Sequence, residues 1–250
     1  MNMQRIIIIP ILFFLSLFAM AQNALEPAVF EDFATMSNEP RQHYKAKRTK
    51  LLQLNKLSCG VFISRSFRNE GILGYDPVKH ALVYHESIKS IWDQAWKESM
   101  ILEKSDDGTN HWEFRDKPLR AWNVPVTYHQ MRIPDDLAFD LFDLWSNAIR
   151  AAREDESQVA VLDGTSYEVF VRGANPMYAR TNGCARRKAP EGQEYLVRRL
   201  LRLNRQLVEA VTKGKRRMLD DLRADIKFLA LDFAQDAAVD DNGWKFRHAF

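Results

Sequence analysis

Three stretches of the chain carry apolar residues at the spacing of an amphipathic helix: residues 134–153, 193–212 and 216–235. In the first, Pro134 and the acidic pair after it suit a helix start, and three aspartates occupy the side opposite the apolar one. The pattern predicts three helices that pack on a core. Phe228 and Leu231 fall outside the apolar side of the third helix, and we expect the C-terminal residues to cover them.

Other stretches show the short runs and turn residues of β-hairpins. The predicted strands are 61–67, 80–84, 100–102, short pieces within 111–132, 159–162, 167–172 and 177–181. Residues 71–77 read as a loop, 88–96 leaves helix and strand open, and 22–58 predicts a loosely packed segment. The sequence therefore predicts an α+β fold, with antiparallel hairpins in the N-terminal and central parts packed against amphipathic helices, two of them C-terminal.

The start of the chain has the pattern of a signal peptide. Arg5 precedes an apolar run, and Ala19 and Ala21 provide the small residues that signal peptidase requires. We expect cleavage after Ala21, with residues 22–250 forming a single exported domain in the periplasm or outside the cell. The alternative is an uncleaved anchor, but the run of about 16 residues is shorter than the roughly 20 that span a bilayer.

Composition narrows the chemistry. The chain has 46% hydrophobic and 28% charged residues, and only two cysteines. In an oxidising compartment, the simplest state of Cys59 and Cys184 is a disulfide. The alternatives are a buried thiol, or a reactive Cys184 whose thiol pKa is lowered by the basic residues around it.

Few catalytic patterns are present. The chain has no G-x-S-x-G, no glycine-rich phosphate loop and no zinc-protease motif. A hairpin would place His80 and His85 on opposite faces, which disfavours a shared metal site. We therefore expect no cofactor and no metal, and name no catalytic residue.

A short motif carries a resemblance. Residues 162–167, Leu-Asp-Gly-Thr-Ser-Tyr, are followed by a second strand and a leucine-rich helix after Glu194. This layout of about 50 residues resembles that of uncharacterised bacterial secreted and immunity-type proteins with a D-G-[TS]-x-[YW] hairpin. The resemblance implies a small non-catalytic α+β protein and assigns no active-site residue.

Charge is distributed unevenly along the chain. The formal net charge is only +3, but residues 180–217 contain twelve basic and three acidic side chains, a local excess of 12 − 3 = +9. A solvated helix face, helped by pairing with the acidic helix near residue 140, is the ordinary explanation. The alternative is an interaction surface for an acidic protein or an anionic component of the cell envelope, while nucleic acid is disfavoured for an exported chain without a reading motif.

These observations favour an exported, non-enzymatic protein-binding factor, such as an inhibitor or immunity protein acting in the periplasm. The alternative is a cell-envelope hydrolase whose site the sequence does not reveal. We expect a partner protein with an acidic surface, no nucleic acid and no membrane span after cleavage. The predicted partner-binding residues are basic side chains on the second amphipathic helix and on the strand before it: Arg180, Arg198, Arg199, Arg202 and Arg205.

Overall fold

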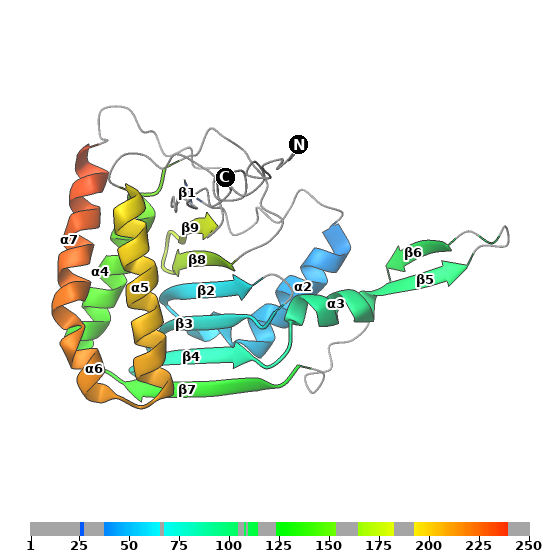
Figure 1. Ribbon diagram of the computed structural model, residues 1–250, viewed down its shortest axis with the longest axis horizontal. Helices are drawn as coiled ribbons and strands as arrows, with labels where there is room; N and C mark the ends of the chain where they lie inside the picture. The colour runs from blue at the N-terminus through cyan, green and yellow to red at the C-terminus, as the bar shows by residue number, and fades with distance from the viewer. Residues whose placement is uncertain are drawn as a thin grey trace, which may run out of the picture.

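The computed structural model describes residues 26–27, 38–65, 68–104, 108, 110–114, 124–153, 165–182 and 193–239. Its centre is a seven-stranded antiparallel sheet (Figure 1). In spatial order the strands are β1 (Glu26–Pro27), β9 (Met177–Asn182), β8 (Thr165–Val171), β2 (Cys59–Arg65), β3 (Gly71–Asp76), β4 (Ala81–Ser87) and β7 (Val126–Arg132). A separate hairpin pairs β5 (Met100–Lys104) with β6 (Asn110–Phe114) and projects away from the sheet.

Helices cover both faces of the sheet, which confirms the predicted α+β class. One face carries α4 and α5, with α6 and α7 packed outside them, and the other carries α2 and α3. The helices are α2 (Asn38–Leu51), the 3-10 turn η3 (Leu54–Lys56), α3 (Ile91–Ser99), α4 (Asp135–Arg150), α5 (Gln193–Thr212), α6 (Arg216–Asp221) and α7 (Arg223–Val239).

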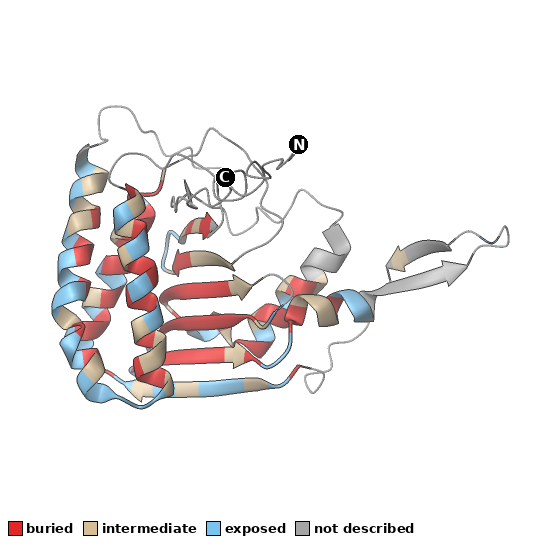
Figure 2. Ribbon diagram, viewed as in Figure 1, coloured by how far each residue is buried: buried red, intermediate tan, exposed pale blue. Residues whose placement is uncertain are grey.

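The alternation of side chains along the strands creates two cores. On β2, Val61 and Ile63 face α4 and α5, whereas Phe62 between them faces α2 and α3. The central strands β2, β3 and β4 are therefore buried along most of their length (Figure 2). No helix within the described ranges combines the length and the apolar character needed to cross a membrane.

The amphipathic helix predictions are confirmed, with three corrections. Helix α5 matches its predicted range and α4 ends at Arg150, three residues earlier than predicted; the apolar sides of both helices are buried. Pro134 is the N-cap of α4 rather than its first helical residue, and the predicted third helix is divided at Leu222 into α6 and α7. Phe228 and Leu231 are exposed on α7, and the C-terminal tail expected over them lies outside the described residues.

The predicted loop at 71–77 is wrong, because residues 71–76 form the buried strand β3. The sequence predicts a loop here because Gly71 and Gly74 are typical of turns. Gly74 instead lies directly opposite Gly60 of β2, where a Cβ on Gly60 would stand 2.2 Å from the Leu73 carbonyl oxygen. The glycines thus permit a close approach of two central strands.

The loosely packed segment predicted for 22–58 is also wrong where the structure describes it. Helix α2 buries Tyr44 and Leu51 together with Lys47 and Arg48, and Leu52 directly after the helix is buried as well. Tyr44, Arg48, Leu51 and Leu52 recur at helical spacing, so the buried stripe was present in the sequence. Its charged members concealed it.

The predicted disulfide between Cys59 and Cys184 is not formed. Cys59 is a buried free thiol, and burial raises its pKa to about 12. Through Val171, Cys59 is level with Met177 at the start of β9, so Asn182 at its end is about 19 Å away by strand geometry. Cys184 lies outside the described residues, but two further residues reach only about 7 Å, and a disulfide needs Cα atoms within about 7 Å.

Candidate functional site

Helix α5 presents basic side chains on the side that faces away from the sheet. Its buried residues, among them Val197, Leu200 and Leu207, fix the rotation of the helix about its axis. Arg198, Arg202 and Arg205 therefore project outward, and all three are exposed. We call these three residues the arginine stripe. The sequence prediction that they point away from the core is confirmed.

The members of the arginine stripe differ in their contacts. Arg198 pairs with Glu194 one turn earlier on the same helix. Arg205 donates from Nε to the Leu201 carbonyl oxygen at 3.3 Å. Within the described part of the chain, no acidic side chain lies within ion-pair distance of Arg202 or Arg205. Two of the three guanidinium groups are thus free to meet an external carboxylate.

Arg199 has a different role from its neighbours. Its guanidinium pairs with Asp232 of α7, and its Cζ lies 5.6 Å from the centroid of the Tyr195 ring. It therefore links α5 to α7 and holds an aromatic ring beside the stripe. Among the predicted partner-binding arginines on α5, Arg199 is the one that forms an ion pair with another helix of the fold.

The acidic helix does not neutralise the stripe. On α4, Asp136 pairs with Arg223 and Asp140 with Lys227, and both basic partners belong to α7. Helix α7 thus takes up acidic charge from α4. The pairing of α5 with the acidic helix, which the sequence left open, is not seen among the described residues.

Two exposed aromatic rings border the arginine stripe. Tyr195 is 65% exposed one turn before Arg198, and Phe228 is 62% exposed on α7. Because α5 and α7 are antiparallel and joined by Arg199 and Asp232, Phe228 lies about level with Arg202. Exposed aromatic rings interleaved with arginine are the composition enriched in protein interfaces.

The structure does not bring Arg180 to this surface. On β9, Ala179 faces the α4 and α5 side, and Tyr178 packs on the α2 side. Arg180 alternates with Ala179 and therefore also faces the α2 side. There it lies directly opposite Glu168 in the register of β8 and β9.

Beneath α2 lies a buried charged cluster that sequence reasoning missed. Lys47 pairs with Glu98 of α3, and Arg48 lies 3.5 Å from Glu168. The Arg48 guanidinium also stacks 4.3 Å from the centroid of the Phe62 ring. Lys47 and Arg48 are each 1% exposed, so these pairs join α2 to α3 and to the sheet rather than form an open site.

Glu70 lies next to this cluster, and its buried carboxylate caps the N-terminus of helix α3. The Glu70 oxygens accept from the backbone N–H groups of Ile91 at 2.7 Å and Trp92 at 3.0 Å, and Ser90 Oγ accepts from Asp93 N–H at 3.1 Å. The first three N–H groups of α3 are thus satisfied. Burial raises the pKa of Glu70, against the opposing effect of these hydrogen bonds.

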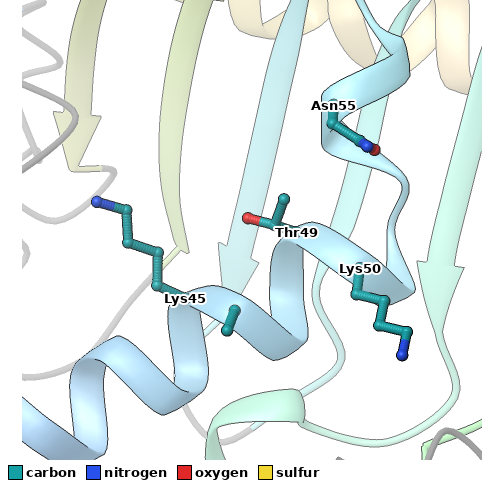
Figure 3. Close-up of a pocket in the computed structure, with 5 residues that line it drawn as sticks. Lys45, Thr49, Lys50 and Asn55 are labelled. Carbon is teal, nitrogen blue, oxygen red and sulfur yellow. The ribbon is translucent and has the colours of Figure 1, made fainter.

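A shallow hollow of about 420 Å³ lies on the outer side of α2, lined by Lys45, Thr49, Lys50 and Asn55 among others. Figure 3 shows Lys45 and Lys50 pointing in different directions rather than toward a common centre. No cluster of three or more metal-ligating side chains occurs among the residues that the structure describes. The hollow therefore offers no convergent polar groups of the kind that fix a small ligand.

Comparison of the chain with protein-family models, with curated proteins and with solved structures finds no match.

Proposed function

We propose that this protein is an exported, non-enzymatic protein-binding factor that acts in the periplasm as an inhibitor or immunity protein. Its partner carries an acidic surface, which docks on the arginine stripe and the neighbouring Tyr195. The alternating exposed arginines of α5, two of them without an acidic neighbour among the described residues, support this proposal most strongly.

Like charges that lie close together on a helix without acidic partners destabilise it. Arg198 is paired with Glu194, but Arg202 and Arg205 lie on the same side of the helix and repel each other, and the ion pairs between α4 and α7 do not involve them. A carboxylate-rich partner would pair with them bidentately and be attracted from a distance. Tyr195 supplies rigid apolar area of the kind that dominates binding energy.

Export is the second part of the proposal and rests on the sequence of residues 1–21, which lie outside the described residues. The mature chain then begins at Gln22. Intact-mass measurement of protein recovered from the periplasmic fraction tests this, because an uncleaved 29.1 kDa chain in the membrane fraction would contradict it.

Photo-crosslinking in cells tests the docking surface. A photoreactive phenylalanine analogue replaces Tyr195 in one strain and Trp96 in a control strain. Trp96 is also an exposed aromatic residue, on the α3 side of the molecule. We expect a discrete crosslinked partner from position 195 and none from position 96. Equal labelling at the two positions would contradict docking on α5.

The purified partner then allows a kinetic test. Reversal of the arginine stripe to glutamate lowers the formal charge by six, and we expect the association rate at low salt to fall at least about tenfold. The matched control reverses the exposed Lys56, Lys89 and Lys97, which lower the charge equally on the other side of the sheet. Unchanged association of the folded stripe variant, or equal slowing by both variants, would reject the proposed surface.

A further inference from the structure

Among the residues that the structure describes, no strand pairs with the outer edge of β7, the last strand of the sheet. It is seven residues long, pairs with β4 on its inner side, and ends the strand order (Figure 1). Figure 2 shows that it is much less buried than the strands beside it. The opposite edge ends in β1, of which the structure describes two residues, Glu26 and Pro27. Short, proline-containing edge strands resist further pairing, whereas long ones invite it.

Two hydrogen bonds reveal which backbone groups of β7 face outward. Ile88 donates to the Pro125 carbonyl oxygen at 2.8 Å, and Ile133 donates to that of His80 at 3.0 Å. Both lie in the register of the β4 and β7 ladder, and hydrogen-bonded pairs alternate along an antiparallel ladder. Odd-numbered residues of β7 therefore bond to β4. The residues whose N–H and C=O groups point outward are Val126, Tyr128, Gln130 and Arg132.

From this arrangement we infer that two copies of the chain pair through β7, antiparallel about a two-fold axis at His129. This centre places Val126 opposite Arg132 of the second copy and Tyr128 opposite Gln130. All four outward-facing residues of each chain then lie in hydrogen-bonded pairs. A centre at residue 128 or 130 leaves at least one of the four unpaired, so the axis at His129 satisfies the most backbone groups.

The side chains of β7 suit a second copy. Arg132 is the only residue with a permanent charge on the strand, and the two-fold places it opposite the uncharged Val126. The two copies of Arg132 are then six residues apart along the paired strands, about 20 Å, so no like charges meet. This pairing is independent of the surface on α5 and stands or falls separately from the proposed function.

The two-fold geometry makes substitutions at neighbouring positions differ sharply. His129 faces its own copy in a close non-hydrogen-bonded pair, whereas Thr127 faces Met131. A lysine at 129 therefore meets a second lysine, and a lysine at 127 meets a methionine. Both residues lie on the same face of β7 and their backbones pair with β4 in the same register, so T127K is the control for H129K. T127K also removes the hydrogen bond that Thr127 Oγ1 donates to the Glu86 carbonyl oxygen, and circular dichroism of the variant takes this loss into account.

Sedimentation velocity of the mature chain over a wide concentration range tests the pairing. We expect a dimer for the native chain and for T127K, and a dissociation constant raised at least about tenfold for H129K. An equimolar mixture of H129K and H129E should form a heterodimer. A native chain that stays monomeric, or an H129K chain that dimerises like T127K, would overturn the inference.

A backbone variant provides a second test. Gln130→Pro removes an outward N–H group but no bond to β4, so the fold is retained while dimerisation weakens at least about tenfold. Circular dichroism verifies that the variant is folded. A folded Gln130→Pro variant with undiminished dimerisation would exclude β7 as the interface.

Discussion

Replacement of Glu70 separates the role of its charge from that of its hydrogen bonds. In Glu70→Ala, the N–H groups of Ile91 and Trp92 lose their acceptor at the start of α3. In Glu70→Gln, one oxygen remains to accept from one of the two N–H groups, the second oxygen is replaced by an amide NH2, and the charge is removed. The two variants therefore alter one site in two distinguishable ways.

The expected magnitudes follow from burial. Glu70 is 1% exposed, so water does not replace the lost acceptor. Each orphaned buried N–H costs about 1–3 kcal/mol, and Glu70→Ala should lower the free energy of unfolding by about 3–5 kcal/mol. The raised pKa of Glu70 indicates that desolvation of the charge outweighs the benefit of its hydrogen bonds. Glu70→Gln leaves one of the two N–H groups without an acceptor but removes the desolvated charge, so it should lower the free energy of unfolding by about 1–2 kcal/mol at neutral pH, less than Glu70→Ala.

The sign of the pH dependence gives a further check. Because the folded state raises the pKa of Glu70, it holds this proton more tightly than the unfolded state does. The Glu70 carboxyl therefore makes its whole contribution to stability at pH values below the pKa that this group has in the unfolded chain. That contribution is lost as the pH rises through the pKa of Glu70 in the folded state. Glu70→Gln lacks that loss, so its stability relative to the native chain should improve from acidic to neutral pH.

Urea unfolding and amide hydrogen exchange measure these effects. Exchange at Ile91 and Trp92 should accelerate in Glu70→Ala, and Ser87→Ala serves as a control that removes a Glu70 contact without touching the α3 amides. A Glu70→Gln variant as destabilised as Glu70→Ala, or a Glu70→Ala variant that loses less than about 1 kcal/mol, would contradict this role of the Glu70 oxygens.

Three further predictions concern the core. Gly60→Ala should lower the free energy of unfolding by about 3 kcal/mol or more, measured in urea, because its Cβ would overlap the Leu73 carbonyl oxygen. Trp145→Phe should cost about 2–4 kcal/mol in the same assay, because it leaves the buried Asn204 oxygen, now 3.3 Å from Trp145 Nε1, without its donor. Burial lowers the pKa of His85, so its stabilising contribution is present above the ordinary histidine pKa and is lost as the pH falls through the folded-state value. The unfolding free energy of His85→Gln should therefore depend less on pH below about 6.5, and equal slopes for both chains would contradict this assignment.

Sequence reasoning located the elements whose periodicity was carried by apolar residues alone. Helix α5 was predicted over its full range because leucine and valine fill its buried side and arginine the other. The sequence-based prediction was wrong for two segments: α2, whose buried side includes charged residues, and β3, which contains glycines. Arg48 takes a core position on α2 because it contacts Glu168 and the Phe62 ring, and Glu168 lies on a strand 120 residues further along the chain.

The candidate site was predictable in part for the same reason. The outward direction of Arg198, Arg202 and Arg205 follows from the helix period. That Arg199 turns to α7 depends on Asp232, whose position is set by the turn between α5 and α7. The face on which Arg180 lies depends on strand register, and a shift of one residue would reverse it.

The order of the strands also determines when the protein can finish folding. β2 pairs on one side with the nearby β3, but on the other with β8, where Glu168 follows Phe62 by 106 residues (168 − 62). Local hairpins form quickly, whereas contacts between distant segments form slowly. In a chain that emerges from the ribosome or from a translocation channel, β2, β3 and β4 can therefore pair first. One edge of β2 then stays unpaired until β8 has emerged and paired with it. During that interval the edge can be bound by a chaperone or by another nascent chain, so a truncation before residue 165 should aggregate rather than fold.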